Sequence, residues 1–225
     1  MTVTAIISAY YAQQFILYRL YNLQEQDPLP EIIVVCQKYS PESVVAATFN
    51  GVRVIETNDI PWISVAWNIG IRAATGDYVT NANSDDKLKP GALAQMADAL
   101  DLHPECGVVF SNVDRLIEGE NIGKEWKRTQ QGTGEYDTTE LINGRYIIGA
   151  MPMWRRKLGF YDEKVRVAQD YEFFARLAKG GTRFWYIDKS LGVYTKRETA
   201  NEWKHKVLCA DEHKRIREKY ADHFI

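Results

Sequence analysis

The chain has 225 residues, 45% of them apolar and 26% charged, which is ordinary for a globular protein that buries a full core. Its formal net charge of −2 excludes a general attraction to nucleic acid or to anionic lipid. The three cysteines lie far apart, which favours reduced thiols over disulfides or a zinc site. No apolar run approaches the roughly 20 residues that span a bilayer, and the first residues lack the order of a signal peptide. We therefore expect a cytoplasmic protein, with peripheral contact as its one route to a membrane.

The first half of the chain alternates strand and helix patterns. Runs of buried and β-branched residues predict strands over residues 2–9, 31–36, 52–57 and 78–81. Helical spacing predicts helices over residues 12–24, from Pro41 onward and over residues 63–73. This alternation predicts a parallel sheet covered on both faces, with ligands beyond the carboxyl ends of the strands. Those ends are residues 9–11, 36–39, 57–59 and 81–86.

The second half has weaker patterns. We expect a helix over residues 90–103, a strand over 107–112, and a variable region over 115–137 with room for one hairpin. A helix that begins near Asp170 precedes two predicted strands, residues 183–187 and 191–194. Trp203, Val207 and Ala210 predict an apolar stripe on a C-terminal helix. No linker separates the halves, so a single domain is expected.

An acidic loop, Asn83-Ser84-Asp85-Asp86, follows the fourth predicted strand. Two adjacent carboxylates repel each other, and a divalent cation would relieve that repulsion. Mg²⁺ and Mn²⁺ bind one or two protein carboxylates together with substrate phosphates and water, and they stabilise a departing diphosphate. The alternative is a turn whose aspartates bond to nearby backbone amides.

Asp170 stands where the later helix begins. One interpretation is an N-cap, since aspartate accepts hydrogen bonds from free amides there. The other is a general base that takes the proton from an acceptor hydroxyl, which requires positioning more than a high pKa.

Taken together, these segments resemble the GT-A glycosyltransferases of family 2. The resemblance covers most of the chain, including the opening strand VTAIISAYYA, the EIIVV strand, the run from Asn68 to Tyr78 and the acidic loop. It resumes at Gly149–Arg155 and at Gln169-Asp170-Tyr171-Glu172. It implies an α/β, Rossmann-like GT-A fold, with a mostly parallel central sheet, helices on both faces and a small antiparallel part in the second half. Residues 1–112 would bind the nucleotide-sugar, and residues 113–225, with the C-terminal helix, the acceptor.

The resemblance also implies an activity and a set of site residues. An inverting transferase of this kind moves a sugar from a nucleotide-sugar, often a UDP-sugar, to a saccharide or lipid-linked acceptor, with Mn²⁺ or Mg²⁺ and no nucleic-acid partner. Its expected setting is bacterial-type surface polysaccharide or glycoconjugate synthesis. Asp170 matches the base, and Asp85 with Asp86 the metal position. The donor residues would be Ser8, Ala9, Tyr10, Gln37, Asp59, Asn68, Asn83 and Ser84, and the acceptor or sugar residues Trp154, Arg155 and Gln169.

Three positions depart from the family pattern. Asn83 replaces the first aspartate of the acidic loop, and Trp67 stands where an arginine is common. Cys36-Gln37 replaces an acidic pair whose first member reads the nucleobase, so either Gln37 or Asp59 substitutes or the base is not uracil. These departures keep open a scaffold protein without turnover. A nucleotidyltransferase is disfavoured because no glycine-rich loop follows the first strand.

Overall fold

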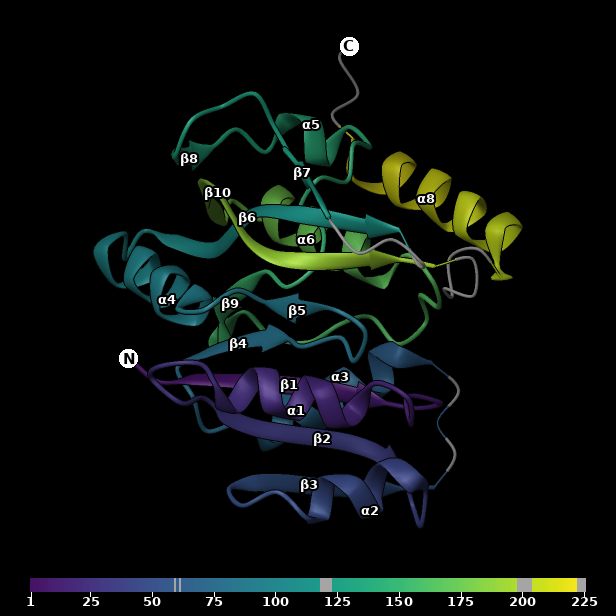
Figure 1. Ribbon diagram of the computed structural model, residues 1–225. Helices are drawn as coiled ribbons and strands as arrows, with labels where there is room; N and C mark the ends of the chain where they lie inside the picture. The colour runs from purple at the N-terminus through teal and green to yellow at the C-terminus, as the bar shows by residue number, and fades with distance from the viewer. Residues whose placement is uncertain (59, 61, 118–122, 198–203, 222–225) are drawn as a thin grey trace.

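One sheet contains strands from both halves of the chain, and its strand ends position the loops that form the candidate site. The computed structural model describes residues 1–58, 60, 62–117, 123–197 and 204–221. Its strands lie in the order β3-β2-β1-β4-β9-β6-β10-β5, with β7 paired to β6 and β8 paired to β10 (Figure 1). Their bounds are β1 Val3–Ala9, β2 Glu31–Gln37, β3 Val52–Thr57, β4 Tyr78–Asn81, β5 Lys87–Leu88, β6 Cys106–Ile117, β7 Lys124–Trp126, β8 Gly134–Tyr136, β9 Met153–Arg155 and β10 Arg183–Lys196.

Helices cover both faces of this sheet. In Figure 1, α1, α2 and α4 lie in front of the strands, and α3 and α6 lie behind them. The apolar residues of β1 serve both layers, because Ile7 packs with the residues of the front helices and Ile6 with those of the rear ones. The helix bounds are α1 Ile16–Gln24, α2 Pro41–Ala47, α3 Ile63–Ala73, α4 Ala92–Leu102, α5 Thr139–Ile142, the 3₁₀ turn η1 Arg156–Leu158, α6 Gln169–Lys179 and α8 Lys206–Tyr220.

The direction of the strands confirms the fold class expected from the sequence. β3, β2, β1 and β4 are parallel neighbours, and β6 is parallel to β10. The short strand β9 lies antiparallel between β4 and β6 and joins the two groups. The carboxyl ends of β1, β2, β3, β4, β6 and β10 therefore meet along one edge of the sheet.

Three details of the second half differ from expectation or refine it. Residues 183–196 form one strand, β10, with register shifts near Ser190, where the sequence suggested two strands. In the variable region β7 pairs antiparallel with β6, as a hairpin would, but β8 pairs with β10. The apolar stripe predicted for the last helix is wrong, since Val207 and Ala210 are exposed and α8 buries Glu212, Ile216 and Tyr220. Trp203 lies outside the described residues. Among the helices that the structure describes, none is both long and apolar enough to cross a bilayer.

Gly70 fixes the distance between α3 and β1. A Cβ at this position would lie 2.3 Å from Cγ2 of Ile6, a fully buried side chain of β1. The helix can approach the strand this closely because Gly70 has no side chain.

We expect Gly70→Ala to lower the free energy of unfolding by about 1–2 kcal/mol. Overpacking a core typically costs about 1–3 kcal/mol, and the better helix propensity of alanine recovers up to about 1 kcal/mol. Urea denaturation would measure the change. Gly132→Ala is the matched control, because nothing lies within 4 Å of its added Cβ. Equal stabilities for the two variants would show that the close approach is not a constraint.

Candidate active site

Two cavities open at the edge of the sheet where the parallel strands end. The first, of about 320 Å³, lies beyond β1 and β2. The second, of about 190 Å³, lies between the acidic loop after β4, the loops of the second half and the start of α6. The topology thus places both cavities where ligands of such sheets bind.

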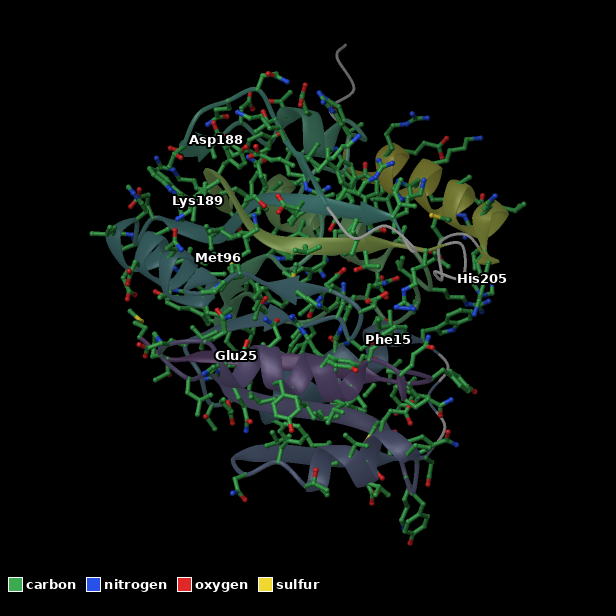
Figure 2. All side chains as sticks on the ribbon, in the orientation of Figure 1. Phe15, Glu25, Met96, Asp188, Lys189 and His205 are labelled. Carbon is green, nitrogen blue, oxygen red and sulfur yellow. The ribbon has the colours of Figure 1, made fainter. Side chains whose placement is uncertain are left out.

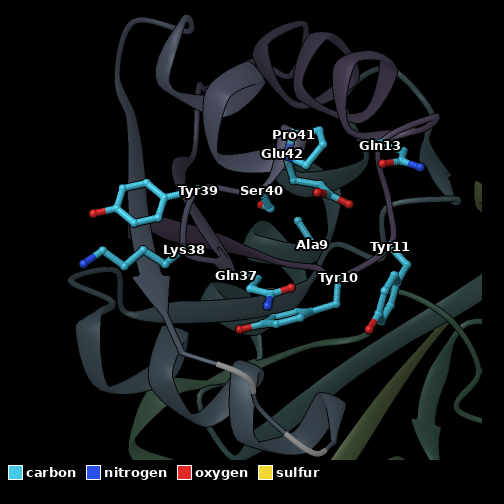
Figure 3. A pocket seen from close by; sticks show the side chains of 10 residues that line it. All are labelled: Ala9, Tyr10, Tyr11, Gln13, Gln37, Lys38, Tyr39, Ser40, Pro41 and Glu42. Atoms are coloured by element: carbon cyan, nitrogen blue, oxygen red, sulfur yellow. The ribbon is translucent and has the colours of Figure 1, made fainter.

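The first cavity contains three of the residues predicted to contact the nucleotide. Ala9, Tyr10 and Gln37 line it, and Figure 3 shows the amide of Gln37 beside the ring of Tyr10. The Tyr10 hydroxyl shares a hydrogen bond with Oγ1 of Thr57, at the end of β3. The remaining lining residues are Tyr11, Gln13, Lys38, Tyr39, Ser40, Pro41 and Glu42.

The loop after β1 is held by a residue that the sequence did not single out. Glu42, at the start of α2, is buried, and its Oε1 accepts a hydrogen bond of 2.6 Å from the backbone N–H of Ala12 (Figure 3). Ser8 lies on β1 just before the cavity and does not line it. Asp59 lies outside the described residues.

Asp86 anchors the acidic loop to the second half of the chain. Its Oδ1 accepts a hydrogen bond of 3.0 Å from the N–H of Thr195 on β10, and its Oδ2 accepts one of 3.0 Å from Nδ2 of Asn83. Burial, and after it the charge of Asp85, raise the pKa of Asp86 to about 7. Asp86, predicted as a metal ligand, therefore has both carboxylate oxygens engaged within the protein.

Asp85 remains partly exposed beside an arginine. The Nη2 of Arg197 lies 3.2 Å from Oδ2 of Asp85, and the Arg197 guanidinium stacks 3.6 Å from the ring centroid of Phe15. Figure 2 places Phe15 at this edge of the sheet. Below the loop, burial lowers the pKa of Arg19 to about 10, although the charges of Asp86 and Asp85 oppose that shift. Arg197 and Arg19 thus place two positively charged side chains beside the acidic loop.

The oxygen atoms of this loop suit a hard divalent cation. Oδ1 of Asn83 is buried without a hydrogen-bond partner, and Asp85 is 32% exposed, so both have acceptor capacity to offer. Within the described part of the chain, no group of three or more His, Cys, Asp or Glu side chains could form a complete metal site. A cation here would need oxygen ligands from a bound phosphate as well.

The second cavity brings Asp170 and Asn83 together. Both line it, as do Tyr146 and Arg128 from the loops of the second half. The Tyr146 hydroxyl donates to Oδ2 of Asp170 at 3.2 Å and lies at the same distance from the carbonyl oxygen of Gly149. Burial, followed by the charge of Asp170, raises the pKa of Tyr146 well above its usual value. The other lining residues are Trp67, Asn81, Trp126, Gly149, Ala150, Met151, Pro152, Phe174 and Tyr194.

Asp170 is not the N-cap of α6. The N-cap position belongs to Ala168, which has no side-chain cap. Just before the helix, the buried carboxylate of Glu212 on α8 accepts hydrogen bonds of 2.9–3.0 Å from the N–H groups of Arg166, Val167 and the N-cap residue Ala168. The capping interpretation of Asp170 is therefore wrong, and its carboxylate faces the cavity.

Unsatisfied polar atoms gather around the second cavity. Nε1 of Trp67, Oδ1 of Asn81, Oδ1 of Asn83 and Nε of Arg128 are all buried and have no hydrogen-bond partner within the described structure. Buried polar atoms are nearly always paired in native proteins, so each exception requires an explanation. A polar ligand in this cavity would supply the missing partners.

Several predicted site residues have structural contacts instead. Asn68 is buried, and its amide bonds to both backbone groups of Tyr161. The side chain of Trp154 is fully buried among aromatic residues, and the guanidinium of Arg155 bonds the carbonyl oxygens of Cys106 and Leu100 at the opposite end of the sheet. The expected sugar or acceptor contact of these two residues does not fit their positions. Gln169 is buried beside Asp170 with Oε1 unpaired, and Ser84 lies half-buried in the acidic loop.

The amino-acid sequence matches one family over most of its length. Residues 4–159 fit the profile of Glycosyl transferase family 2. The chain belongs to this family. The match runs from β1 through the acidic loop and β9 to η1, so it covers the first cavity and the loop beneath the second.

Two solved structures share the fold of this chain, and one curated protein shares part of its sequence. This chain is similar in fold to Staphylococcus aureus TarS 1–349 in complex with UDP-GlcNAc, with a TM-score of 0.74 and 19% sequence identity. The match covers 89% of this chain and 60% of that one. For S. aureus TarS 1–349 in complex with UDP, the TM-score is 0.73 and the sequence identity 17%. That match covers 98% of this chain and 70% of the TarS chain. The uncharacterized protein y4gI of Sinorhizobium fredii is 25% identical over 180 residues, which span 76% of this chain and 18% of that relative. The chain thus spans less than two thirds of the length of y4gI and of TarS 1–349 in its complex with UDP-GlcNAc.

Besides Glu42, the sequence left four charged residues in or around the site unmarked. Arg19 could have been found, since it lies on the apolar stripe of α1 defined by Ile16, Leu20 and Leu23. Glu212 has a similar signal, because it shares a helical face with Ile216 and Tyr220. Arg128 and Arg197 lie in segments without periodicity, and only the fold brings them to the site.

We expect Glu212→Ala to lower the free energy of unfolding by about 2–4 kcal/mol, since hydrogen bonds to a charged acceptor are lost and buried amides are left unpaired. Guanidinium chloride denaturation would measure the loss. Glu218→Ala is the matched control on the same helix, because Glu218 is 59% exposed and its ion pair with Lys214 is a loose 3.9 Å. A Glu212 variant as stable as this control would show that these three hydrogen bonds do not stabilise the fold.

Proposed function

We propose that this chain is an inverting glycosyltransferase that moves a sugar from a nucleoside-diphosphate sugar to a hydroxyl group of a saccharide or lipid-linked acceptor. The observation that carries the proposal is the second cavity, which is lined by both Asp170 and the acidic-loop residue Asn83. Family 2 membership supports transfer of a sugar. Surface polysaccharide or glycoconjugate synthesis is the setting that suits such a reaction.

The donor's nucleoside would occupy the first cavity. Tyr10 offers an aromatic face, and the amide of Gln37 can both donate to and accept from a nucleobase. The TarS structures that resemble this chain contain UDP-GlcNAc and UDP, which supports a nucleotide-sugar as the donor. Residues 1–112 would then bind the donor, and residues 113–225 would supply the acceptor side of the second cavity.

Asp170 would act as the general base. The acceptor oxygen attacks the anomeric carbon, the bond from that carbon to the diphosphate oxygen breaks, and the electron pair leaves with the diphosphate. Asp170 takes the proton of the attacking hydroxyl as the new bond forms. A single displacement of this kind inverts the configuration at the anomeric carbon. The hydrogen bond from Tyr146 orients the Asp170 carboxylate for this step.

A divalent cation, Mn²⁺ or Mg²⁺, would bind at Asp85 with Asn83 beside it. When bound, it would offset the negative charge that develops on the leaving diphosphate. Arg197 already pairs with Asp85, so the protein contributes a fixed positive charge at the same place. Asp86 holds the acidic loop to β10; Asn83 of this loop lines the second cavity, whereas Asp85 does not.

We expect Asp170→Asn to reduce kcat at least about a hundredfold while leaving donor affinity near its normal value, because a general base typically contributes 10²–10⁴ to the rate. The measurement is nucleotide release from a panel of nucleotide-sugars with an acceptor present, together with calorimetric binding of the donor that wild type uses. Asp211→Asn on the exposed side of α8 is the control.

Two outcomes would count against this role. An Asp170→Asn variant with near-normal turnover would remove Asp170 from the chemistry. Wild type that binds nucleoside diphosphate but releases no nucleotide from any donor would favour the scaffold alternative, which Asn83, Cys36 and Trp67 kept open.

We expect Asp85→Ala to abolish the effect of Mn²⁺ on nucleoside-diphosphate affinity. In wild type, Mn²⁺ should tighten binding, because the ion links the protein carboxylate to the phosphate oxygens. Calorimetry with and without Mn²⁺ would measure both affinities. Asp98→Ala on the exposed face of α4 should behave as wild type. Identical responses to Mn²⁺ in all three proteins would rule out Asp85 as the metal contact.

A further inference from the structure

Arg128 lines the second cavity and has no assigned role in the chemistry. Its side chain is 8% exposed, and burial lowers the pKa of its guanidinium. Within the described residues its Nε has no hydrogen-bond partner and no ion pair joins Arg128 to a carboxylate, although the charge of Asp86 partly opposes the fall in its pKa. Burying an unpaired cation costs several kcal/mol, so a fold that keeps one does so for a reason other than stability.

The guanidinium is fixed by its surroundings. Its central carbon lies 4.0 Å from the ring centroid of Trp126, and the backbone of Gly149 lies against Nη2, where a Cβ on that glycine would approach within 2.2 Å. Gly149 has a φ of +69°, a conformation that suits glycine. The plane of Arg128 is therefore confined between an aromatic ring and a backbone that leaves room for it.

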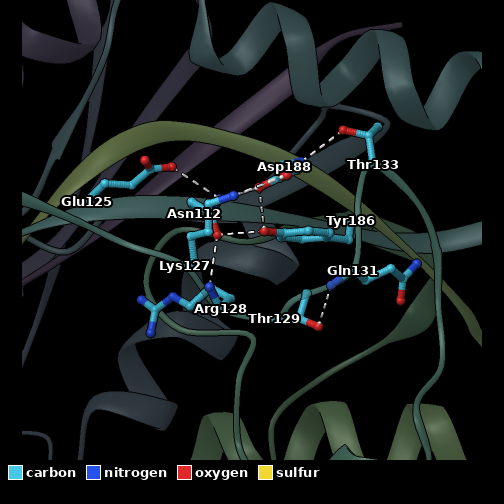
Figure 4. Close-up of polar contacts among 9 residues, drawn as sticks. All are labelled: Asn112, Glu125, Lys127, Arg128, Thr129, Gln131, Thr133, Tyr186 and Asp188. Atoms are coloured by element: carbon cyan, nitrogen blue, oxygen red, sulfur yellow. Dashed lines mark hydrogen bonds and ion pairs between the residues drawn. The ribbon is translucent and has the colours of Figure 1, made fainter.

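The backbone of Arg128 is held by a buried amide (Figure 4). Oδ1 of Asn112, a fully buried residue of β6, accepts hydrogen bonds from the N–H of Arg128 at 2.9 Å and from the hydroxyl of Tyr186 at 2.7 Å. Nδ2 of Asn112 donates to Oδ1 of Asp188 at 2.9 Å. The backbone of Arg128 is thus part of a hydrogen-bond network. Its guanidinium lies in the wall of the second cavity, where Nε has no hydrogen-bond partner among the described residues.

We infer that Arg128 forms an oxyanion subsite of the second cavity, which binds a phosphate or carboxylate group of a substrate. A guanidinium presents its N–H groups in a planar fork that matches the two oxygens of such a group. Arg128 reaches the cavity beside Tyr146, whose hydroxyl bonds both Asp170 and the carbonyl of Gly149. The anion would therefore bind close to the candidate base. This deepens the proposed function and rests on it only for the identity of the substrate.

The oxyanion has two possible sources, the diphosphate of the donor and an acidic group on a sugar substrate. Isothermal titration calorimetry of the whole chain would separate them with two sets of probes. Inorganic pyrophosphate and UDP, compared with uridine, report on the diphosphate. Glucose 6-phosphate and glucuronate, compared with glucose, report on an acidic sugar.

We expect Arg128→Met to weaken binding of at least one of these anions by roughly ten- to hundredfold, as for the loss of a charge-assisted hydrogen-bond pair. Uridine and glucose should bind as they do to wild type. Arg128→Lys keeps the charge without the fork, so its affinity should lie between the two. Arg115→Met is the matched control, because Arg115 lies over the same Trp126 ring at 5.6 Å but does not line the cavity.

Thermal unfolding of the ligand-free variants distinguishes a binding role from a structural one. Because Arg128→Met removes a buried unpaired charge and keeps most of the side-chain volume, its Tm should not fall below that of wild type. A clear fall in Tm, with anion affinities unchanged, would make Arg128 a structural residue and overturn the inference. So would wild type that binds none of these anions at millimolar concentration.

The outcomes also separate this inference from the proposed function. Loss confined to pyrophosphate and UDP places the donor diphosphate at Arg128, and loss confined to the acidic sugars places a sugar substrate there. Anion binding that depends on Arg128 in a protein without transfer activity would support the subsite and not the transferase. If Arg128→Met keeps both its transfer activity and its anion affinities, the transferase is supported and the oxyanion subsite is overturned.

Discussion

The short strand β9 determines whether the two halves of this chain form one site. It pairs antiparallel with β4 through Thr80 and with β6 through Val108 and Val109, and no other strand joins the two groups of parallel strands in the described structure. Trp154 fills the core at this seam, and Arg155 bonds backbone carbonyl groups at its far end. Trp154 also packs against Phe173 and Phe174 of α6, so the seam and this helix share one core.

The sequence predicted most of the first half because its signals are local. Each strand from β1 to β4 is a short apolar run, each helix between them has a periodic stripe, and the parallel arrangement follows from their alternation. The rule that ligands bind beyond the strand ends then pointed to Tyr10, Gln37 and Asn83, which do line the cavities. Site residues at the ends of clearly patterned strands are the ones that a sequence can locate.

The rest depended on contacts between distant segments. An aspartate at a helix start is a good candidate for an N-cap, yet the N-cap of α6 is Ala168, whose N–H is bonded by Glu212, 44 residues later in the chain. Trp154 and Arg155 were predicted as acceptor or sugar contacts on the resemblance to family 2. Whether such a pair faces a cavity or a core depends on strand pairing, which a three-residue strand does not reveal in advance.

The pairing of Asp85 with Arg197, over an acidic loop tied to β10 by Asp86, has a consequence for how the protein meets an ion. Arg19 and Arg197 reduce the repulsion between the two aspartates, and the hydrogen bonds of Asp86 hold the loop in place with contacts from the chain itself. The cation that we propose at Asp85 could then bind weakly and reversibly, after the phosphate oxygens that would complete its coordination shell. An ion held in this way would come and go with each turnover.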